Sequence, residues 1–157
     1  MSDQRFLVRK AAVLGAGVMG AQIAAHLVNA NIETLLFELP GDTGNPNANV
    51  IKAVEKLKKQ EPAPLSVKTK AACIQSANYD QHLEKLKDCD LVIEAIVENA
   101  EIKKKLYAQL EPKLKPSAIL ASNTSVIPIG TIMAQVRTRD RALGTHWFNP
   151  PFLVPLV

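Results

Sequence analysis

The chain has 157 residues, of which 47% are hydrophobic and 22% are charged, and its formal net charge is +4. This length suits one α/β domain with a sizeable core and leaves no room for a second full domain. The modest charge without a basic tail argues against nucleic-acid binding, and no apolar run approaches the ~18 residues of a membrane helix, so we expect a cytoplasmic protein with no membrane span.

The first predicted unit is a strand, a glycine turn and a helix. An apolar strand over residues 11–14 is followed by Gly15, Gly17 and Gly20. In this pattern the first glycine permits a tight turn, the second lets backbone amides approach a diphosphate, and the third lets the helix pack closely on the strand. The helix would point the positive end of its dipole at the phosphates. The alternative is a glycine turn that serves packing alone.

The second predicted strand, residues 34–38, ends in the carboxylate of Glu38. This carboxylate lies about 20 residues after the glycine turn, where dinucleotide-binding domains place the acid that binds the ribose hydroxyls. The context therefore favours dinucleotide binding over a purely structural turn. A carboxylate repels a 2′-phosphate, and no Arg follows it in residues 39–41, so the pattern predicts NAD rather than NADP.

The next stretch predicts a polar loop, two helices and a short strand. Asn45 is expected to cap a helix of about residues 47–59, and Ser66 to cap a second helix that runs through Cys73. A short strand follows at residues 74–78.

Lysines recur along both of these helices. They fit either a solvated face or a site for an anionic ligand, such as a nucleotide phosphate of a substrate. Cys73 and Cys89 lie far apart without the spacing of a metal or redox motif, so we expect two reduced structural thiols and no metal site.

The second half of the chain alternates strands with helices. Strands are predicted at residues 90–97, 118–122 and 142–146, and helices at 98–110 and 129–134. The longer helix would turn three apolar side chains inward: Ile102, Leu106 and Leu110. Together these elements predict a Rossmann-type, doubly wound α/β fold, with a mostly parallel sheet covered by helices on both faces.

Ligands of such sheets bind beyond the carboxyl ends of the strands, and two side chains at these ends can carry chemistry. His146 closes the last predicted strand, and an imidazole there can take a hydroxyl proton as hydride leaves the same carbon. Ser125 follows the neighbouring strand and could hydrogen-bond the reacting oxygen. The alternatives are a structural histidine and a serine that caps the helix near Pro128.

These residues carry a family resemblance over nearly the whole chain, which we interpret as one domain, residues 1–157. The sequence resembles the NAD-binding domain of L-3-hydroxyacyl-CoA dehydrogenases, including the multifunctional fatty-acid oxidation enzymes. Four segments carry the resemblance, the last three being more specific than the glycine turn: 13–20, 93–99, 121–125 and 146–150.

The resemblance implies oxidation of a 3-hydroxyacyl-CoA to the 3-ketoacyl-CoA in β-oxidation, with hydride transfer to NAD. His146 looks like the catalytic base and Ser125 like a residue beside the substrate oxygen, and the lysine-rich helical pair is where family members contact coenzyme A. The cofactor-binding residues indicated by the glycine pattern and the resemblance together are Gly15, Gly17, Val18, Met19, Gly20, Glu38, Ile96, Val97, Glu98, Lys103, Ser125 and Asn149.

The chain departs from the family pattern in three places. Glu38 stands where the family usually has Asp, and residues 39–49 have no counterpart that aligns. The Glu that follows the matching Leu-Val in the family, and the all-helical domain that completes the acyl site and the homodimer, are not in this sequence. We therefore expect a fragment that binds NAD but catalyses the reaction poorly. The alternatives are a non-catalytic NAD-binding protein and a reductase of a short hydroxy acid.

Overall fold

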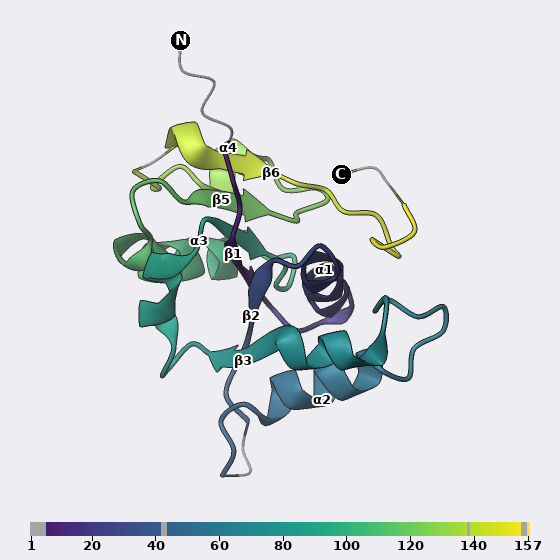
Figure 1. Cartoon of the computed structure of the whole chain (residues 1–157). Helices are drawn as coiled ribbons and strands as arrows, with labels where there is room; N and C mark the ends of the chain where they lie inside the picture. The colour runs from purple at the N-terminus through teal and green to yellow at the C-terminus, as the bar shows by residue number, and fades with distance from the viewer. Residues whose placement is uncertain (1–5, 42–43, 138, 155–156) are drawn as a thin grey trace.

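One sheet of six parallel strands organises the chain, in the order β3-β2-β1-β4-β5-β6 (Figure 1). The structure is a computed structural model and describes residues 6–41, 44–137, 139–154 and 157. The strands are β1 (Lys10–Leu14), β2 (Glu33–Glu38), β3 (Ile74–Asn78), β4 (Leu91–Glu94), β5 (Ile119–Ser122) and β6 (Ala142–Gly144).

Helices and short 3₁₀ turns connect the strands. The α-helices are α1 (Val18–Asn29), α2 (Ala48–Leu57), α3 (Ala100–Leu110) and α4 (Ile129–Ile132). The 3₁₀ turns are η1 (Lys68–Cys73), η2 (Leu83–Asp88), η3 (Glu111–Lys113) and η4 (Arg139–Arg141). None of the helices within the described ranges is long and apolar enough to cross a membrane.

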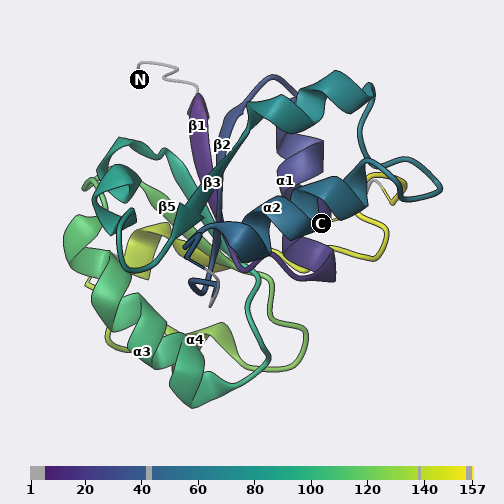
Figure 2. The same cartoon turned by 90° about the horizontal axis from the view of Figure 1, so that it is seen from below.

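The two faces of the sheet bury separate apolar cores. On one face α1 and α2 pack side chains such as Ile23 and Val54 against β1 and β2, and on the other α3 and α4 contribute Leu110 and Ile132. Figure 2 shows these two helical layers on opposite sides of the strands. Helices on both faces of a parallel sheet confirm the predicted Rossmann-type fold.

The strand order reverses beside β1, which pairs with β2 on one side and with β4 on the other. From β1 the chain proceeds through β2 to β3 at one edge of the sheet, and after returning to β4 it proceeds through β5 to β6 at the other edge, so the switch point lies between the carboxyl ends of β1 and β4. Doubly wound sheets bind their ligands at this switch point.

Several predicted boundaries were wrong by a few residues, and each has a local cause. The strand predicted at 90–97 ends at Glu94, because the amide of Ile96 turns back to donate to the Glu94 carboxylate (2.8 Å). The last strand ends at Gly144 rather than residue 146. Beyond both ends the chain leaves the sheet and forms loops at its carboxyl edge.

The two helices of the lysine-rich stretch also begin differently from the prediction. The N-cap of α2 is Asn47, because Asn45 folds into a turn in which its Oδ1 accepts from the Asn47 amide (3.0 Å). The segment after Ser66 is the 3₁₀ turn η1, and Ser66 does not cap it. The amide of Ser66 instead donates to Asn29 Oδ1 (3.0 Å), which fixes this connection to the end of α1.

Candidate functional site

The glycine turn between β1 and α1 is tightly packed at both ends and open in its middle. Gly15 has φ +103° and lies so close to β4 that a Cβ would approach Ala95 O to 2.7 Å. A Cβ at Gly20 would lie 1.8 Å from Gly15 O. Apart from its own chain neighbours, no described residue places an atom within 4 Å of the Cβ position of Gly17, which is exposed. The first and third glycines are therefore needed for packing, and the second leaves backbone accessible.

The start of α1 lies beside this open backbone. Gly17 is the N-cap and supplies no side chain, so no side-chain oxygen caps the first amides of the helix, and its first turn holds no acidic residue. Val18 is 58% exposed next to it, whereas Met19 is half-buried and packs on the core. Uncapped amides at a helix N-terminus are suited to a phosphate group.

Glu38, at the end of β2, faces the glycine turn. Its Oε2 accepts from the Ala16 amide (2.8 Å) and its Oε1 from the Leu39 amide (2.9 Å). The two groups that the sequence assigned to a dinucleotide, the glycine turn and the acid after the second strand, are thus in direct contact. Together they fit the diphosphate and ribose of such a ligand.

A cavity of about 610 Å³ opens beside Glu38 and the glycine turn. Tyr79 lines it, and its ring packs against Phe37 with 5.7 Å between the ring centroids. The Tyr79 hydroxyl is buried and has no hydrogen-bond partner among the residues that the structure describes. Burial, and then the charge of Glu38, raise the pKa of Tyr79, so the hydroxyl remains a donor. Five predicted cofactor residues line the cavity: Gly15, Gly17, Glu38, Ile96 and Val97.

Sequence reasoning missed Tyr79. It follows β3 at the carboxyl edge of the sheet, so its position at a strand end was the only signal available. Its aromatic ring lines the cavity beside Glu38, and a flat apolar ring there is suited to contact with a base.

On the other side of the switch point Glu98 binds the loop that follows β5. Its Oε1 accepts from the hydroxyl of Thr124 and from the amides of Ser125 (2.9 Å) and Val126 (3.2 Å). Its Oε2 lies 3.1 Å from Lys103 Nζ. Burial by itself would raise the pKa of Glu98, but the hydrogen bonds from Thr124, Lys103 and the backbone lower it to about 2.

This anchored loop presents Ser125 to His146. Ser125 Oγ lies 3.3 Å from His146 Nε2, and both side chains are exposed at the edge of a cavity of about 420 Å³. Phe148 stacks on the imidazole with 4.7 Å between the ring centroids. The amide of Trp147 donates to Asn123 Oδ1 (2.9 Å), which holds the segment after β6 against the segment after β5. The two predicted catalytic residues therefore lie together.

Lys103, which the resemblance implied to lie near the nicotinamide ribose, is buried between two carboxylates. Its side chain is 1% exposed, and its ammonium lies between the carboxylates of Glu94 (2.7 Å) and Glu98 (3.1 Å). In the described structure it contacts these two acids and lines no cavity, so a direct contact with a ribose stays a prediction.

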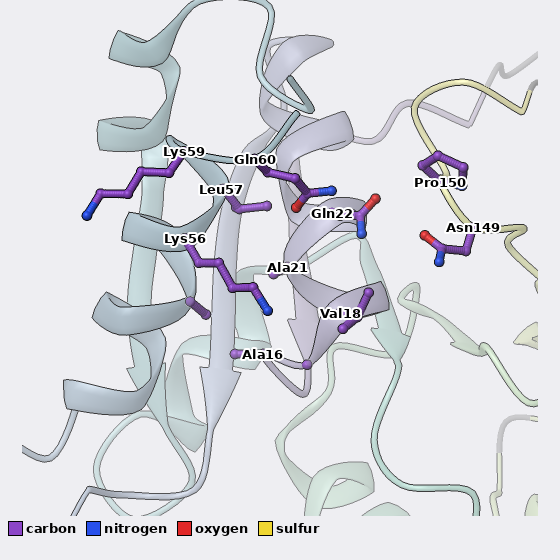
Figure 3. A pocket seen from close by; sticks show the side chains of 12 residues that line it. Ala16, Val18, Ala21, Gln22, Lys56, Leu57, Lys59, Gln60, Asn149 and Pro150 are labelled. Atoms are coloured by element: carbon purple, nitrogen blue, oxygen red, sulfur yellow. The ribbon is translucent and has the colours of Figure 1, made fainter. Parts of the chain in front are cut away.

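A third cavity, of about 650 Å³, separates α1 and α2 from the segment after β6 (Figure 3). Asn149 stands on the far wall, opposite Gln22 and Val18, while Lys56 extends from α2 toward the glycine turn. Lys59 extends away from α1. Asn149 thus shares a cavity with the start of α1, and the structure places it apart from the cavity of Ser125 and His146.

Gln22 is a second residue that sequence reasoning missed. The residue is 3% exposed and lines this cavity, and its Oε1 has no hydrogen-bond partner within the described part of the chain. The signal was a single amide in an otherwise apolar stretch of helix, between Ala21 and Ile23. A buried polar group without a partner is uncommon in folded proteins, which sets Gln22 apart from the other residues of this wall.

Comparison with known proteins gives one family. The sequence pattern described as "3-hydroxyacyl-CoA dehydrogenase, NAD binding domain" matches residues 10–157. The chain is 41% identical over 161 residues to the "Probable 3-hydroxyacyl-CoA dehydrogenase" of Bacillus subtilis, covering 91% of this chain and 20% of that protein. It is 36% identical over 159 residues to the "Fatty acid oxidation complex subunit alpha" of Acinetobacter baylyi, covering 96% of this chain and 21% of that protein.

Solved structures agree with the sequence comparison. The crystal structure of 3-hydroxybutyryl-CoA dehydrogenase from Escherichia coli K12 superposes with a TM-score of 0.79 at 29% identity, over 94% of this chain and 31% of that one. The chain therefore spans only a part of the length of each of these proteins.

Proposed function

Since this chain belongs to the family of 3-hydroxyacyl-CoA dehydrogenase NAD-binding domains, we propose that it holds NAD and the catalytic histidine of a β-oxidation enzyme. The reaction is oxidation of the 3-hydroxyl of a 3-hydroxyacyl-CoA to the ketone. One observation carries the proposal beyond cofactor binding. The pair of Ser125 Oγ and His146 Nε2, 3.3 Å apart, lies at the same edge of the sheet as the glycine turn, and binding a dinucleotide needs no such pair.

The cofactor is held by backbone and by one carboxylate. The amides at the start of α1 bind the diphosphate, and Glu38 binds the ribose hydroxyls of the adenosine half. The cavity with Tyr79 takes the adenine. Glu38 would repel a 2′-phosphate, which favours NAD over NADP. When bound, NAD supplies the acceptor for the hydride that leaves C3.

The proton is handled by the chain's own residues. His146 Nε2 accepts the proton of the 3-hydroxyl, and Ser125 Oγ donates to the same oxygen and keeps it within reach of the imidazole. Glu98 fixes the backbone of Ser125 through its amide. General-base catalysis of this kind contributes roughly 10² to 10⁴ in rate.

We assign the coenzyme A part of the substrate to the cavity of about 650 Å³ that is lined by α1, α2 and the segment after β6. Lys56 supplies a positive charge for a phosphate, and Gln22 Oε1 supplies a buried acceptor for an amide N–H of the pantetheine arm. Asn149 lines the same cavity.

The homodimer implied by the resemblance belongs to the same proposal, and light scattering on the natural protein at its full length tests it.

The reaction is tested on the natural protein that contains this sequence, at its full length. We expect it to consume NADH with acetoacetyl-CoA and to leave free acetoacetate almost unused. His146→Gln should lower kcat by about 10² to 10⁴, the range of general acid–base catalysis.

The matched control is His82→Gln. His82 accepts from the Asn78 amide (3.0 Å) beside β3, at the opposite edge of the sheet, and we expect kcat to stay within about twofold. Equal losses in the two variants, or faster turnover of the free acid than of its coenzyme A ester, would contradict the proposal.

A further inference from the structure

A buried carboxylate, Glu94 at the end of β4, lines none of the cavities described above. Its side chain is 0% exposed, and each of its oxygens accepts two hydrogen bonds. Lys103 Nζ (2.7 Å) and the Ile96 amide (2.8 Å) donate to Oε1. The hydroxyls of Tyr107 (2.7 Å) and Ser122 (2.6 Å) donate to Oε2. These four donors use the whole acceptor capacity of the carboxylate.

The donors come from three separate parts of the fold. Lys103 and Tyr107 belong to α3, Ser122 ends β5, and Ile96 lies in the turn after β4. Glu94 therefore ties one helix to two neighbouring strand ends at the edge where the predicted site lies.

Two routes of contacts lead from Glu94 to the Ser125 loop. In the first, Ser122 Oγ accepts from the amide of Thr124 (3.3 Å), one residue before Ser125. In the second, the ammonium of Lys103 bridges Glu94 and Glu98, whose carboxylate accepts from the Ser125 amide. Both routes hold the backbone that sets the distance from Ser125 to His146.

Stability alone does not account for such a network. A buried ion pair is costly to desolvate, and well-packed apolar residues of similar volume often stabilise a core as well or better. Four directed hydrogen bonds do, however, fix the relative positions of the groups that donate them.

We propose that Glu94 is a positioning residue of the dehydrogenase site, which sets the Ser125 loop and the turn at Ile96 in place for substrate and cofactor. The inference rests on the proposed function. Glu94 touches neither ligand and acts through Ser122, Lys103 and Glu98.

The test compares Glu94→Gln with a matched loss of charge at the other end of the same strand. Glutamine has nearly the same shape as glutamate, but an NH₂ group replaces one of the two carboxylate oxygens. The two groups that donate to that oxygen in the unsubstituted chain therefore lose their acceptor. The control is Asp90→Asn. Asp90 accepts from the amides of Arg9 (2.8 Å) and Lys10 (3.1 Å) and pairs with Lys115, all at the amino end of β4.

Three quantities are measured on the chain: the midpoint of thermal unfolding, the NMR signals of the Ser125 amide and the His146 ring, and the Kd for NADH. We expect both variants to lower the midpoint. Only Glu94→Gln should displace the Ser125 and His146 signals, and it should raise the Kd for NADH about tenfold, the effect of losing one hydrogen bond to a charged group. Unmoved signals together with a Kd within twofold of the unsubstituted chain would overturn the inference.

If Glu94→Gln does not fold, Tyr107→Phe serves as a milder variant for the same test. It removes one of the four donors and leaves the charges in place, so we expect smaller displacements of the same signals; an unchanged spectrum at Ser125 and His146 overturns the inference here too. The signals are read without ligand. Failure of the unsubstituted chain to bind NADH would instead count against the proposed function, so the two failures are distinguishable.

Discussion

Gly20 is the residue at which the fold of the glycine turn tolerates least change. Its missing Cβ would lie 1.8 Å from Gly15 O, and neither backbone can yield without separating α1 from β1. We expect Gly20→Ala to lower the free energy of unfolding by about 3 kcal/mol, as severe overpacking does.

Urea denaturation followed by circular dichroism measures this loss. Gly130→Ala is the control, since no atom lies within 4 Å of the Cβ position of this exposed helical glycine. It should change stability by less than about 1 kcal/mol. Similar losses in both variants would show that close packing at Gly20 is not the cause.

Glu98 gives the stability of the chain a defined pH dependence. In the folded chain its pKa is lowered to about 2, against an ordinary value of 4.5. A carboxylate whose pKa is lowered by folding stabilises the protein above the unfolded pKa, and this contribution is lost as the pH falls toward the folded pKa. The contribution of Glu98 should therefore be complete above about pH 5 and disappear between about pH 4.5 and pH 2.

We expect Glu98→Gln to lose less stability than the unsubstituted chain when the pH is lowered from about 6 to about 3. Urea midpoints at the two pH values measure the difference. Glu101→Gln is the comparison, because Glu101 is exposed and its pairing with Lys104 (2.9 Å) is screened by solvent. An equally reduced pH dependence of stability in both variants would contradict the role of the hydrogen bonds that Glu98 accepts from Thr124 and the Ser125 loop.

Glu38 should decide the choice of cofactor. We expect Glu38→Gln to weaken NADH binding about tenfold, since a charge-assisted hydrogen bond to ribose is lost, and to reduce the discrimination against NADPH. Fluorescence titrations with the two nucleotides measure both effects. Glu33→Gln, at the other end of β2 and paired with Lys10 (2.9 Å), should leave both affinities unchanged. A discrimination ratio that Glu38→Gln leaves unaltered would refute the assignment.

Among the elements, α3 departs most from its predicted face. Leu106 and Leu110 are buried as the apolar spacing predicted, but Ile102 is 47% exposed and Lys103 is buried in its place. Periodicity treats lysine as a solvent-facing residue. Here the buried carboxylate of Glu94 supplies a partner for the ammonium, and no pattern within the helix reveals an acid on a neighbouring strand.

Helix α2 carries the prediction for coenzyme A. Lys56 extends from it toward the glycine turn, so Lys56→Gln should weaken binding of coenzyme A about fivefold, with a smaller salt dependence than in the unsubstituted chain. Calorimetric titration at two salt concentrations measures this. Lys104→Gln on α3 removes the same charge away from the cavity and should have no effect. Equal weakening by both substitutions would indicate a general effect of net charge.

For the whole molecule, the fold and the position of the site were largely predictable, because both depend on local pattern. All six strands were predicted, although residues 74–78 form no apolar run, and the carboxyl-edge rule for parallel sheets predicted that Glu38, Ser125 and His146 would lie on one edge. What the sequence did not predict are the side chains whose role depends on partners distant in the chain. Gln22 and Tyr79 line cavities built by several elements, and Glu94 meets its donors only after folding.

The central claim is that this chain is an NAD-binding domain whose glycine turn and Glu38 act together. Calorimetric titration of the chain with NADH and then with NADPH tests it most directly. We expect one NADH per chain and at least tenfold weaker binding of NADPH, because the proposed partner of the ribose is the carboxylate of Glu38, which would repel a 2′-phosphate. No binding of NADH, or NADPH bound as tightly as NADH, would contradict the account.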